Sequence, residues 1–249
     1  MSTRLAEKPF VWAHRGASGY APENTMEAFR LAAEMSADGI ETDVRFSKDK
    51  QIIIIHDEKI DRVSNGQGVV GDYTVDELKF FDFGYKFKNQ LTGTKIPTLA
   101  ELLEFLTTND LYLNIEIKST DEDMPKALVE LVAKYGLTDR VLYSSFNHLQ
   151  LVRILEHQPD ARIGALYSFN MIKPWDYCEN MGAYASHPSH VQLDLFPEYV
   201  EECHKKGIRV HPWTCDDPAR IGELVDLGVD AIISNVPDVA LGVVAEKLK

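Results

Sequence analysis

The chain has 249 residues, a length that accommodates either one large domain or two of average size. It contains 26 Lys and Arg against 39 Asp and Glu, a net charge of −13, so binding of a nucleic acid through a basic surface is not expected. With 45% hydrophobic and 26% charged residues, the composition is that of a folded globular protein and excludes a largely disordered chain.

The cysteine pattern and the first residues both favour an intracellular location. The 3 cysteines, Cys178, Cys203 and Cys215, form no C-x-x-C pair, and residues 1–8 mix charges in a way unlike a secretory signal. No run approaches the roughly 18 apolar residues of a membrane span. We therefore expect a cytoplasmic protein with reduced thiols and no integral membrane segment.

From residue 10 onward, short runs of β-branched and aromatic residues alternate with segments of helical periodicity. This alternation predicts strands that are each followed by a helix, as in parallel βαβ units. Strands are expected at Phe10–His14, Leu111–Ile117, Val141–Ser144, Arg162–Leu166, Ile208–Trp213 and Val229–Ile233. Helices are expected at Thr25–Met35, Met124–Lys134, His148–His157, Pro197–Lys206 and Pro218–Leu227.

Two further strands, at Ile40–Phe46 and within Ala183–Val191, bring the strand positions to residues near 12, 41, 114, 142, 164, 185, 210 and 231. Eight strands alternating with helices predict an α/β fold of the (β/α)8 TIM barrel type, in a single domain over residues 1–249. A doubly wound open sheet is the alternative, but no G-x-G-x-x-G follows any of these strands.

One pair of strands interrupts the alternation. Ile40–Phe46 and Gln51–His56 are separated only by residues 47–50, too few for a parallel crossover, so they are predicted to form an antiparallel hairpin. A turn centred on Lys48 and Asp49 would place Glu41 across from His56. Residues from about 57 to 95 are rich in glycine and polar residues, and we expect them to form a small insertion over one end of the barrel.

Charged residues occur where two of the predicted strands end. Glu41 and Asp43 lie two apart and face the same way on a strand, as do Glu116 and Lys118. Charges inside a barrel are costly unless they are paired or bound to a metal, and at the C-terminal mouth they indicate a catalytic site. Three carboxylates without a cysteine or second histidine at metal spacing favour one hard divalent cation, Mg²⁺ or Ca²⁺. Salt bridges from these carboxylates to Arg15 and Lys118 alone are the other interpretation.

Two histidines are expected at the same mouth. His14 ends the first strand and is followed by Arg15, and His56 ends the hairpin. An acidic metal site with Arg15, Lys118 and two imidazoles provides the groups that phosphoryl chemistry requires. The cations would hold the phosphate, while one imidazole takes up a proton and the other donates one.

Taken in order, these motifs resemble those of the glycerophosphodiester phosphodiesterase family, over about residues 10–239. The segments that carry the resemblance are His14-Arg15-Gly16, Pro22-Glu23-Asn24-Thr25, Glu41-x-Asp43, His56-Asp57, Asp61-Arg62, Asn65-Gly66-x-Gly68, Ile96-Pro97-Thr98-Leu99, Glu116-x-Lys118, Ser144-Ser145-Phe146 and Trp213-Thr214. The resemblance implies a (β/α)8 barrel with an insertion after the His-Asp pair. It also implies a phosphoric diester hydrolase that converts glycerophosphodiesters, such as glycerophosphocholine or glycerophosphoethanolamine, to glycerol 3-phosphate and an alcohol, in lipid and glycerol metabolism.

The resemblance also implies roles for individual residues. The metal ligands would be Glu41, Asp43 and Glu116, the acid–base pair His14 and His56, and the phosphate-binding residues Arg15 and Lys118. Trp213 would either stack on the substrate or pack within the barrel. The family often has Asn two residues after Trp-Thr, where this chain has Asp216, and Thr-Asp after the last strand, where Ser234-Asn235 stands. We expect these departures at the pocket rim, where they would affect the preferred alcohol.

Two other functions are compatible with these residues. A phospholipase D-like lyase would attack lysolipids and stop at the cyclic phosphate, and a non-catalytic barrel would only bind its ligand. The preferred alcohol, the metal, the nucleophile (water or the 2-hydroxyl of the substrate) and the oligomeric state are not indicated by the sequence.

Overall fold

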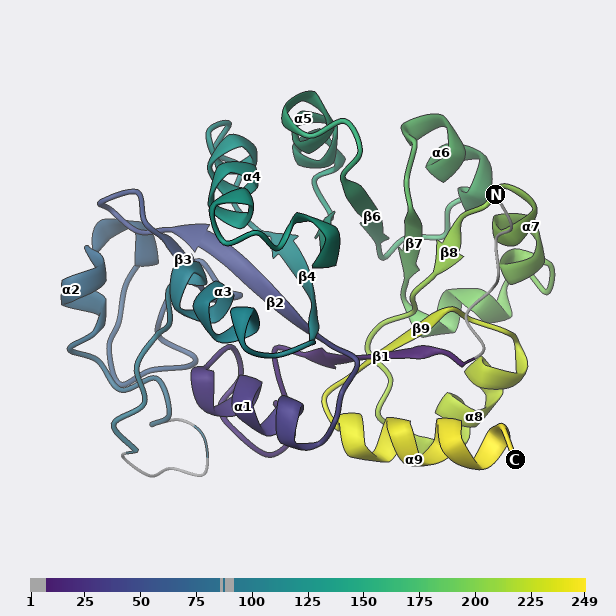
Figure 1. Ribbon diagram of the computed structural model, residues 1–249, viewed down its shortest axis with the longest axis horizontal. Coiled ribbons are helices and arrows are strands. Elements are labelled where there is room, and N and C mark those ends of the chain that lie inside the picture. Colours follow the sequence, from purple (N-terminus) through teal and green to yellow (C-terminus); the bar gives the residue numbers. More distant parts are fainter. Residues whose placement is uncertain (1–7, 86, 88–91) are drawn as a thin grey trace.

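The computed structural model describes residues 8–85, 87 and 92–249 (Figure 1). Residues 1–7, whose charges argue against a secretory signal, lie outside the described residues, as do residues 86 and 88–91 of the predicted insertion. In the part of the chain that the structure describes, no helix combines the length and the apolar character that crossing a bilayer requires.

Eight parallel strands form the wall of a barrel. They are β1 (Phe10–His14), β2 (Gly39–Phe46), β4 (Tyr112–Ile117), β5 (Val141–Ser145), β6 (Arg162–Tyr167), β7 (Ala185–Pro188), β8 (Arg209–Val210) and β9 (Ala231–Ser234). Their order is β8-β7-β6-β5-β4-β2-β1-β9. The Asp230 amide donates to the Val210 carbonyl (3.0 Å), which links the chain entering β9 to β8. The predicted (β/α)8 barrel is confirmed, and each strand lies where the sequence places it.

Helices surround the strands on the outside (Figure 1). They are α1 (Met26–Glu34), α2 (Val75–Leu78), α3 (Leu99–Thr107), α4 (Met124–Lys134), α5 (His148–His157), α6 (Pro174–Met181), α7 (Tyr199–Lys205), α8 (Pro218–Asp226) and α9 (Pro237–Lys247), with short 3₁₀ turns at Val70–Asp72, Thr138–Arg140 and His190–Asp194. The bounds of α4 and α5 are those predicted. No helix is predicted at α2, α3, α6 or α9, although Thr98 and Glu101 form a capping box at the start of α3.

The hairpin is antiparallel as predicted, but its register is shifted by one residue. In the structure β2 pairs with β3 (Ile52–Ile54), and Val44 lies opposite Ile54. The Ser47 amide donates to the Gln51 carbonyl (3.0 Å), so the loop has three residues and is not a turn centred on the first two of them. Its last residue, Lys50, has a φ of +57°, as expected for a three-residue hairpin loop.

The segment that follows β3 packs around an apolar cluster of its own. Ile60, Leu78 and Phe83 of this segment are buried against Ile53 and Ile55 of the hairpin. In Figure 1, α2 and β3 lie at the end of the molecule far from both labelled termini. The placement agrees with an insertion anchored on the barrel by β3. A single domain that includes this segment stays a prediction.

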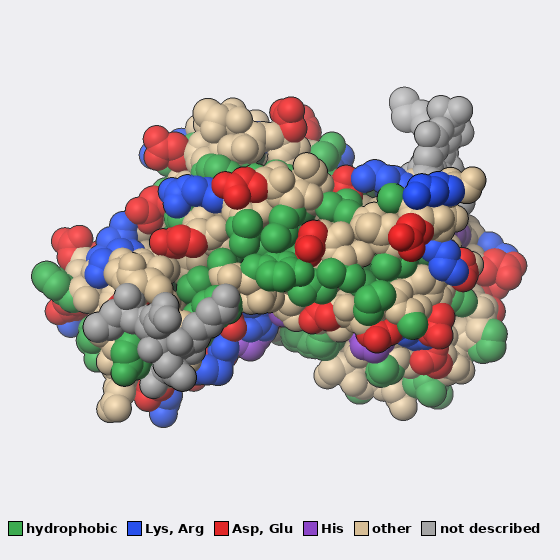
Figure 2. Space-filling view, turned by 90° about the horizontal axis from the view of Figure 1, so that it is seen from below, with side chains coloured by type: hydrophobic (Ala, Val, Ile, Leu, Met, Phe, Trp, Pro, Cys, Tyr) green, Lys and Arg blue, Asp and Glu red, His purple; other side chains and the backbone are tan. Residues whose placement is uncertain are grey.

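The main core lies between the strands and the surrounding helices. Because side chains alternate along a strand, every second residue of each strand faces away from this core. Ile40 and Val44 of β2 belong to this core, as do Ile115 and Ile117 of β4. The intervening carboxylates, Glu41 and Asp43 on β2 and Glu116 on β4, therefore face away from it. Figure 2 shows acidic side chains interspersed with Lys and Arg over one face of the molecule, not gathered in a single patch.

Candidate active site

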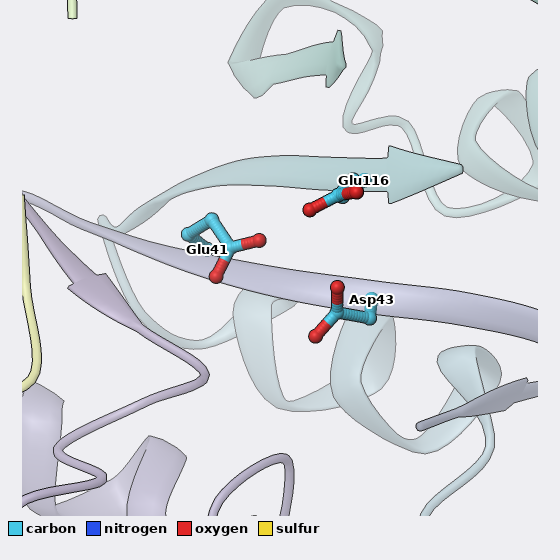
Figure 3. A group of neighbouring side chains, drawn as sticks. All are labelled: Glu41, Asp43 and Glu116. Atoms are coloured by element: carbon cyan, nitrogen blue, oxygen red, sulfur yellow. The ribbon is translucent and has the colours of Figure 1, made fainter. Parts of the chain in front are cut away.

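Three carboxylates from two neighbouring strands point toward one common space (Figure 3). Glu41 and Asp43 lie on β2 and Glu116 on β4, and the parallel register places Asp43 directly beside Glu116. Each residue offers an oxygen, and these oxygens lie within 4.8 Å of one another. All three residues are buried, with 4%, 0% and 7% of their surface exposed. The predicted acidic cluster thus assembles as the strand periodicity requires.

The electrostatics of this cluster fit a bound cation. Burial and the neighbouring carboxylates raise the pKa of Glu41 well above its usual value and that of Glu116 to about 7. Burial would also raise the pKa of Asp43, but the nearby positive charge of Arg15 lowers it. Asp43 Oδ1 is buried and accepts no hydrogen bond from the described residues. Crowded carboxylates and a buried oxygen without a hydrogen bond suit a hard divalent cation with oxygen ligands.

The two predicted phosphate-binding cations contact the same cluster. Arg15 Nε lies 3.3 Å from Asp43 Oδ2, and the Arg15 amide donates to Glu41 Oε2 (3.1 Å). Lys118 Nζ donates to Glu116 Oε1 (2.7 Å). The salt bridges considered from the sequence are therefore present. With all three carboxylates ionised, these two cations leave one negative charge unbalanced, which a metal ion would neutralise.

The tautomer of His14 follows from its hydrogen bonds. His14 Nδ1 lies 2.7 Å from Asn235 Oδ1, and Asn235 Nδ2 donates to Asp216 Oδ2 (2.6 Å). Because the amide nitrogen faces the carboxylate, its oxygen is the acceptor and His14 Nδ1 carries the proton. The free Nε2 lies 3.9 Å from Glu41 Oε2. Burial, and then Arg15, lower the pKa of His14 to about 4, so the ring is neutral at pH 7.

The two departures from the family pattern meet in space. Asp216 and Asn235 form a pair in which the Asn235 amide N–H also donates to Asp216 Oδ1 (2.8 Å). In the family pattern the amide and the carboxylate often stand in the opposite order. The expectation that these positions act only on the pocket rim is therefore incomplete, because Asn235 holds His14.

His56 is held by a carboxylate instead of an amide. Its Nδ1 lies 2.6 Å from Asp57 Oδ1, and Asp57 Oδ2 accepts from Arg62 Nε (2.6 Å). Burial lowers the pKa of His56, while the charge of Asp43 and the hydrogen bond with Asp57 oppose that shift. The predicted pairing of His56 across from Glu41 is wrong, because the hairpin register is shifted and β3 ends at Ile54.

These side chains share one cavity of about 100 Å³. Its lining contains seven of the eight predicted site residues, namely His14, Arg15, Glu41, His56, Glu116, Lys118 and Trp213, while Asp43 is not part of the lining. The Trp213 indole N–H donates to the His187 carbonyl (2.8 Å), and its ring meets Phe146 edge-on at 5.5 Å. Trp213 is thus both packed in the barrel and part of the cavity wall.

Comparison with known proteins shows which family this geometry belongs to. The model of the glycerophosphoryl diester phosphodiesterase family matches residues 14–239. The chain belongs to this family of enzymes. A glycerophosphodiester phosphodiesterase of Caldanaerobacter subterraneus subsp. tengcongensis is 40% identical over 240 residues, which cover 95% of this chain and 98% of the relative.

Solved structures of the glycerophosphodiester phosphodiesterase family share the fold. The glycerophosphodiester phosphodiesterase of Agrobacterium tumefaciens str. C58 is 30% identical, with a TM-score of 0.84 over 94% of this chain and 99% of that one. A phosphodiesterase of Oleispira antarctica, solved in complex with the product sn-glycerol-3-phosphate, is 29% identical, with a TM-score of 0.89 over 96% and 97% of the two chains.

In this member of the phosphodiesterase family, a chain of ion pairs connects Arg15 to His56. The sequence does not predict this chain. Arg62 Nη1 and Nη2 donate to Glu23 (2.7 and 2.8 Å), which also accepts from Arg15 Nη1 (2.9 Å). Arg62 in turn holds Asp57 and so His56. Glu23 and Arg62 both belong to the motifs quoted above, but only the fold shows that they link Arg15 to His56.

Proposed function

We propose that this enzyme hydrolyses glycerophosphodiesters such as glycerophosphocholine or glycerophosphoethanolamine, releasing glycerol 3-phosphate and an alcohol. The observation that carries the proposal is the meeting of a buried carboxylate triad, two cations and two histidines in one cavity. The glycerol 3-phosphate bound in the Oleispira antarctica relative supports it. The buried, unpaired cysteines support an intracellular role, which we propose is the turnover of deacylated phospholipids in the cytoplasm.

Glu41, Asp43 and Glu116 are the residues that would hold one divalent cation, Mg²⁺ or Ca²⁺. The cation would stabilise negative charge on the phosphoryl oxygens. Arg15 and Lys118 line the same cavity and supply fixed N–H donors for the other phosphate oxygens. With the divalent cation bound, Arg15 and Lys118 would reverse the negative charge of the three carboxylates, so that an anionic substrate would be attracted to a protein of net charge −13.

The hydrogen-bond partners of the two histidines assign different roles to them. His14 donates its Nδ1 proton to a neutral amide and stays neutral at pH 7, so its free Nε2 would accept the proton of the attacking hydroxyl. The hydrogen bond to Asp57 opposes the burial that lowers the pKa of His56, and from its protonated form His56 would donate a proton to the departing alcohol oxygen. The attacking group is either water or the 2-hydroxyl of the substrate, the latter through a cyclic phosphate.

The test is direct. Purified protein incubated with glycerophosphocholine or glycerophosphoethanolamine in Mg²⁺ or Ca²⁺ should release glycerol 3-phosphate, measured with an enzyme-coupled assay. Removing the cation with EDTA should reduce the rate to background, and re-adding the metal should restore it, because the triad without a cation cannot offset the phosphate charge. If no glycerophosphodiester is hydrolysed with either metal, the proposed function is wrong.

One observation favours a second candidate, a lyase that acts on lysolipids. An open apolar groove of about 400 Å³ adjoins the catalytic cavity, and Phe146 lines both. The groove also contains Leu149, Val152 and Tyr177, which are 66%, 43% and 41% exposed and could hold an acyl chain. Phosphorus NMR of the products from lysophosphatidylcholine separates the two reactions. A persistent cyclic phosphate indicates the lyase, whereas no reaction with this lysolipid, beside release of glycerol 3-phosphate from glycerophosphocholine, indicates the phosphodiesterase.

Replacing Arg62 with alanine should lower kcat/KM for a glycerophosphodiester by about 10-fold or more. The substitution removes the ion pairs that orient Arg15 through Glu23 and His56 through Asp57, and small misplacements of such groups are costly. Steady-state kinetics of Arg62→Ala beside Arg30→Ala, an exposed arginine of α1, provide the measurement and its control. Equal kcat/KM values for the two variants would contradict the positioning role.

A further inference from the structure

A second cavity, of about 280 Å³, lies at the N-terminal end of the barrel. Its wall is built from residues where strands begin: Phe10 starts β1, Tyr112 starts β4, Arg162 starts β6 and Arg209 starts β8. The candidate active site lies at the opposite end, since His14 is the last residue of β1. A five-residue strand spans roughly 15 Å, so the two cavities are separate sites.

The wall of this cavity carries positive charge that the described residues do not neutralise. Arg140, Arg162 and Arg209 are half-buried there, and none of their guanidinium groups forms a salt bridge with a carboxylate in the described part of the chain. Arg162 donates to the backbone carbonyl of Asp139 (2.9 Å). The acidic side chain of the wall, Asp230, already accepts hydrogen bonds from two other groups, a histidine and a backbone amide, both at 2.8 Å.

Aromatic rings lie beside these charges. The guanidinium groups of Arg162 and Arg209 lie 5.5 and 5.1 Å from the ring centre of Tyr184, so cation–π contact holds both beside the same ring. Phe10 lies 4.8 Å from Trp12 and 5.4 Å from Tyr112, measured between ring centroids. The cavity therefore combines two cations with an aromatic wall.

Two buried polar atoms of the wall lack partners. Trp12 and His211 line the cavity and are each 4% exposed, yet Trp12 Nε1 and His211 Nδ1 have no hydrogen-bond partner among the described residues. A buried donor without a partner costs about 1–3 kcal/mol. Both atoms are closed off from the cavity space, so recognition of a polar ligand there would rest on the arginines.

We propose that this cavity binds a small aromatic phosphate monoester, with the phosphate on Arg162 and Arg209 and the ring against Phe10, Trp12 and Tyr112. Two guanidinium groups match the double charge of a phosphate monoester better than the single charge of a carboxylate. The volume admits a small molecule, and the net charge of −13 disfavours a polyanion. Nucleoside monophosphates and simple aryl phosphates share this chemistry.

The proposal is tested by calorimetric titration of the full chain with AMP and with phenyl phosphate, beside adenosine and inorganic phosphate. AMP and phenyl phosphate should both bind more tightly than adenosine or inorganic phosphate. Whichever of the two binds more tightly shows whether the ligand is a nucleotide or a simple aryl phosphate. Arg209→Gln and Arg162→Gln should each weaken binding by about 10-fold or more, since each removes charge-assisted hydrogen bonds. Arg30→Gln, on the surface of α1, should bind as the unaltered protein does.

Lys118→Gln separates this site from the candidate active site, because Lys118 lines only the catalytic cavity of these two. Binding that survives Lys118→Gln and is weakened by Arg209→Gln supports the proposal, whether or not the protein hydrolyses glycerophosphodiesters. No binding at millimolar ligand, or binding weakened by Lys118→Gln but unchanged in Arg209→Gln, would overturn it. Circular dichroism and thermal melting check that each variant is folded, and Arg162→Gln carries the test if Arg209→Gln is not.

Discussion

Replacing His14 or His56 with alanine should lower kcat for glycerophosphodiester hydrolysis by about 10²- to 10⁴-fold in each case. His14 Nε2 would no longer accept the proton of the attacking group, and His56 would no longer protonate the alcohol oxygen as it leaves. The loss should appear in kcat more than in KM, since Arg15 and Lys118 still bind the phosphate. Steady-state kinetics of the two variants measure this effect, and His157→Ala, at an exposed position of α5, is the matched control.

A substrate with a better leaving group separates the two roles. In glycerol p-nitrophenyl phosphate the phenolate departs without a proton, so His56→Ala should lose much less activity on it than on glycerophosphocholine. His14→Ala should lose activity on both substrates, because the nucleophile must be deprotonated in each. The opposite pattern would reverse the assignment of base and acid. Full activity in both purified variants would refute His catalysis and indicate that a contaminating enzyme is responsible, which favours the non-catalytic barrel.

Glu116→Gln should abolish activity and yet stabilise the metal-free protein by about 1–3 kcal/mol at pH 8. Without a cation, burial and the charge of Asp43 raise the pKa of Glu116 to about 7. The ionised side chain is therefore less favourable in the folded protein than in the unfolded chain. Loss of the hydrogen bond from Lys118 offsets part of the gain. In the presence of metal the unaltered protein should be more stable than Glu116→Gln, because only the unaltered triad gains stability from the cation.

The raised pKa of Glu116 determines how stability changes with pH. Between the ordinary pKa of a glutamate and about 7, the folded metal-free protein binds more protons at Glu116 than the unfolded chain does, so the contribution of this residue to the free energy of unfolding falls as the pH rises through this window. Urea unfolding in EDTA should therefore show a stability gain of Glu116→Gln over the unaltered protein that is larger at pH 8 than at pH 5. The histidines are present in both proteins, so their titration cancels in this difference. Glu130→Gln, on the exposed surface of α4, is the control. Equal stabilities at pH 8 would contradict the prediction.

The sequence predicts the carboxylate cluster because strand periodicity is a local property. Glu41 and Asp43 alternate with apolar residues within one strand, and Glu116 does so in another, so their shared face follows once the strands are placed side by side. The hairpin register could not be predicted in the same way. Two- and three-residue loops fit residues 47–51 equally well, and only the bond between Ser47 and Gln51 decides between them.

The partners of the histidines depend on distant parts of the chain. Asn235 contacts His14 across 221 residues, and Arg62 contacts Glu23 across 39. Nothing local in the sequence distinguishes these polar residues from solvated ones, because their role exists only when the barrel brings the ends of β1 and β9 together. The fold class and the candidate metal ligands could thus be predicted from the sequence. The contacts that orient the histidines required the structure.

The two histidines are each attached to a different apolar core. His14 ends β1, whose Val11 and Ala13 belong to the main core, whereas His56 directly follows Ile55 of the cluster that the inserted segment shares with the hairpin. Protein structures open in separate cooperative units, and a small cluster opens more readily than a barrel. Opening of the inserted segment would part the acid from the base while leaving the carboxylates in place. We therefore expect the enzyme to lose activity first through opening of its smaller core.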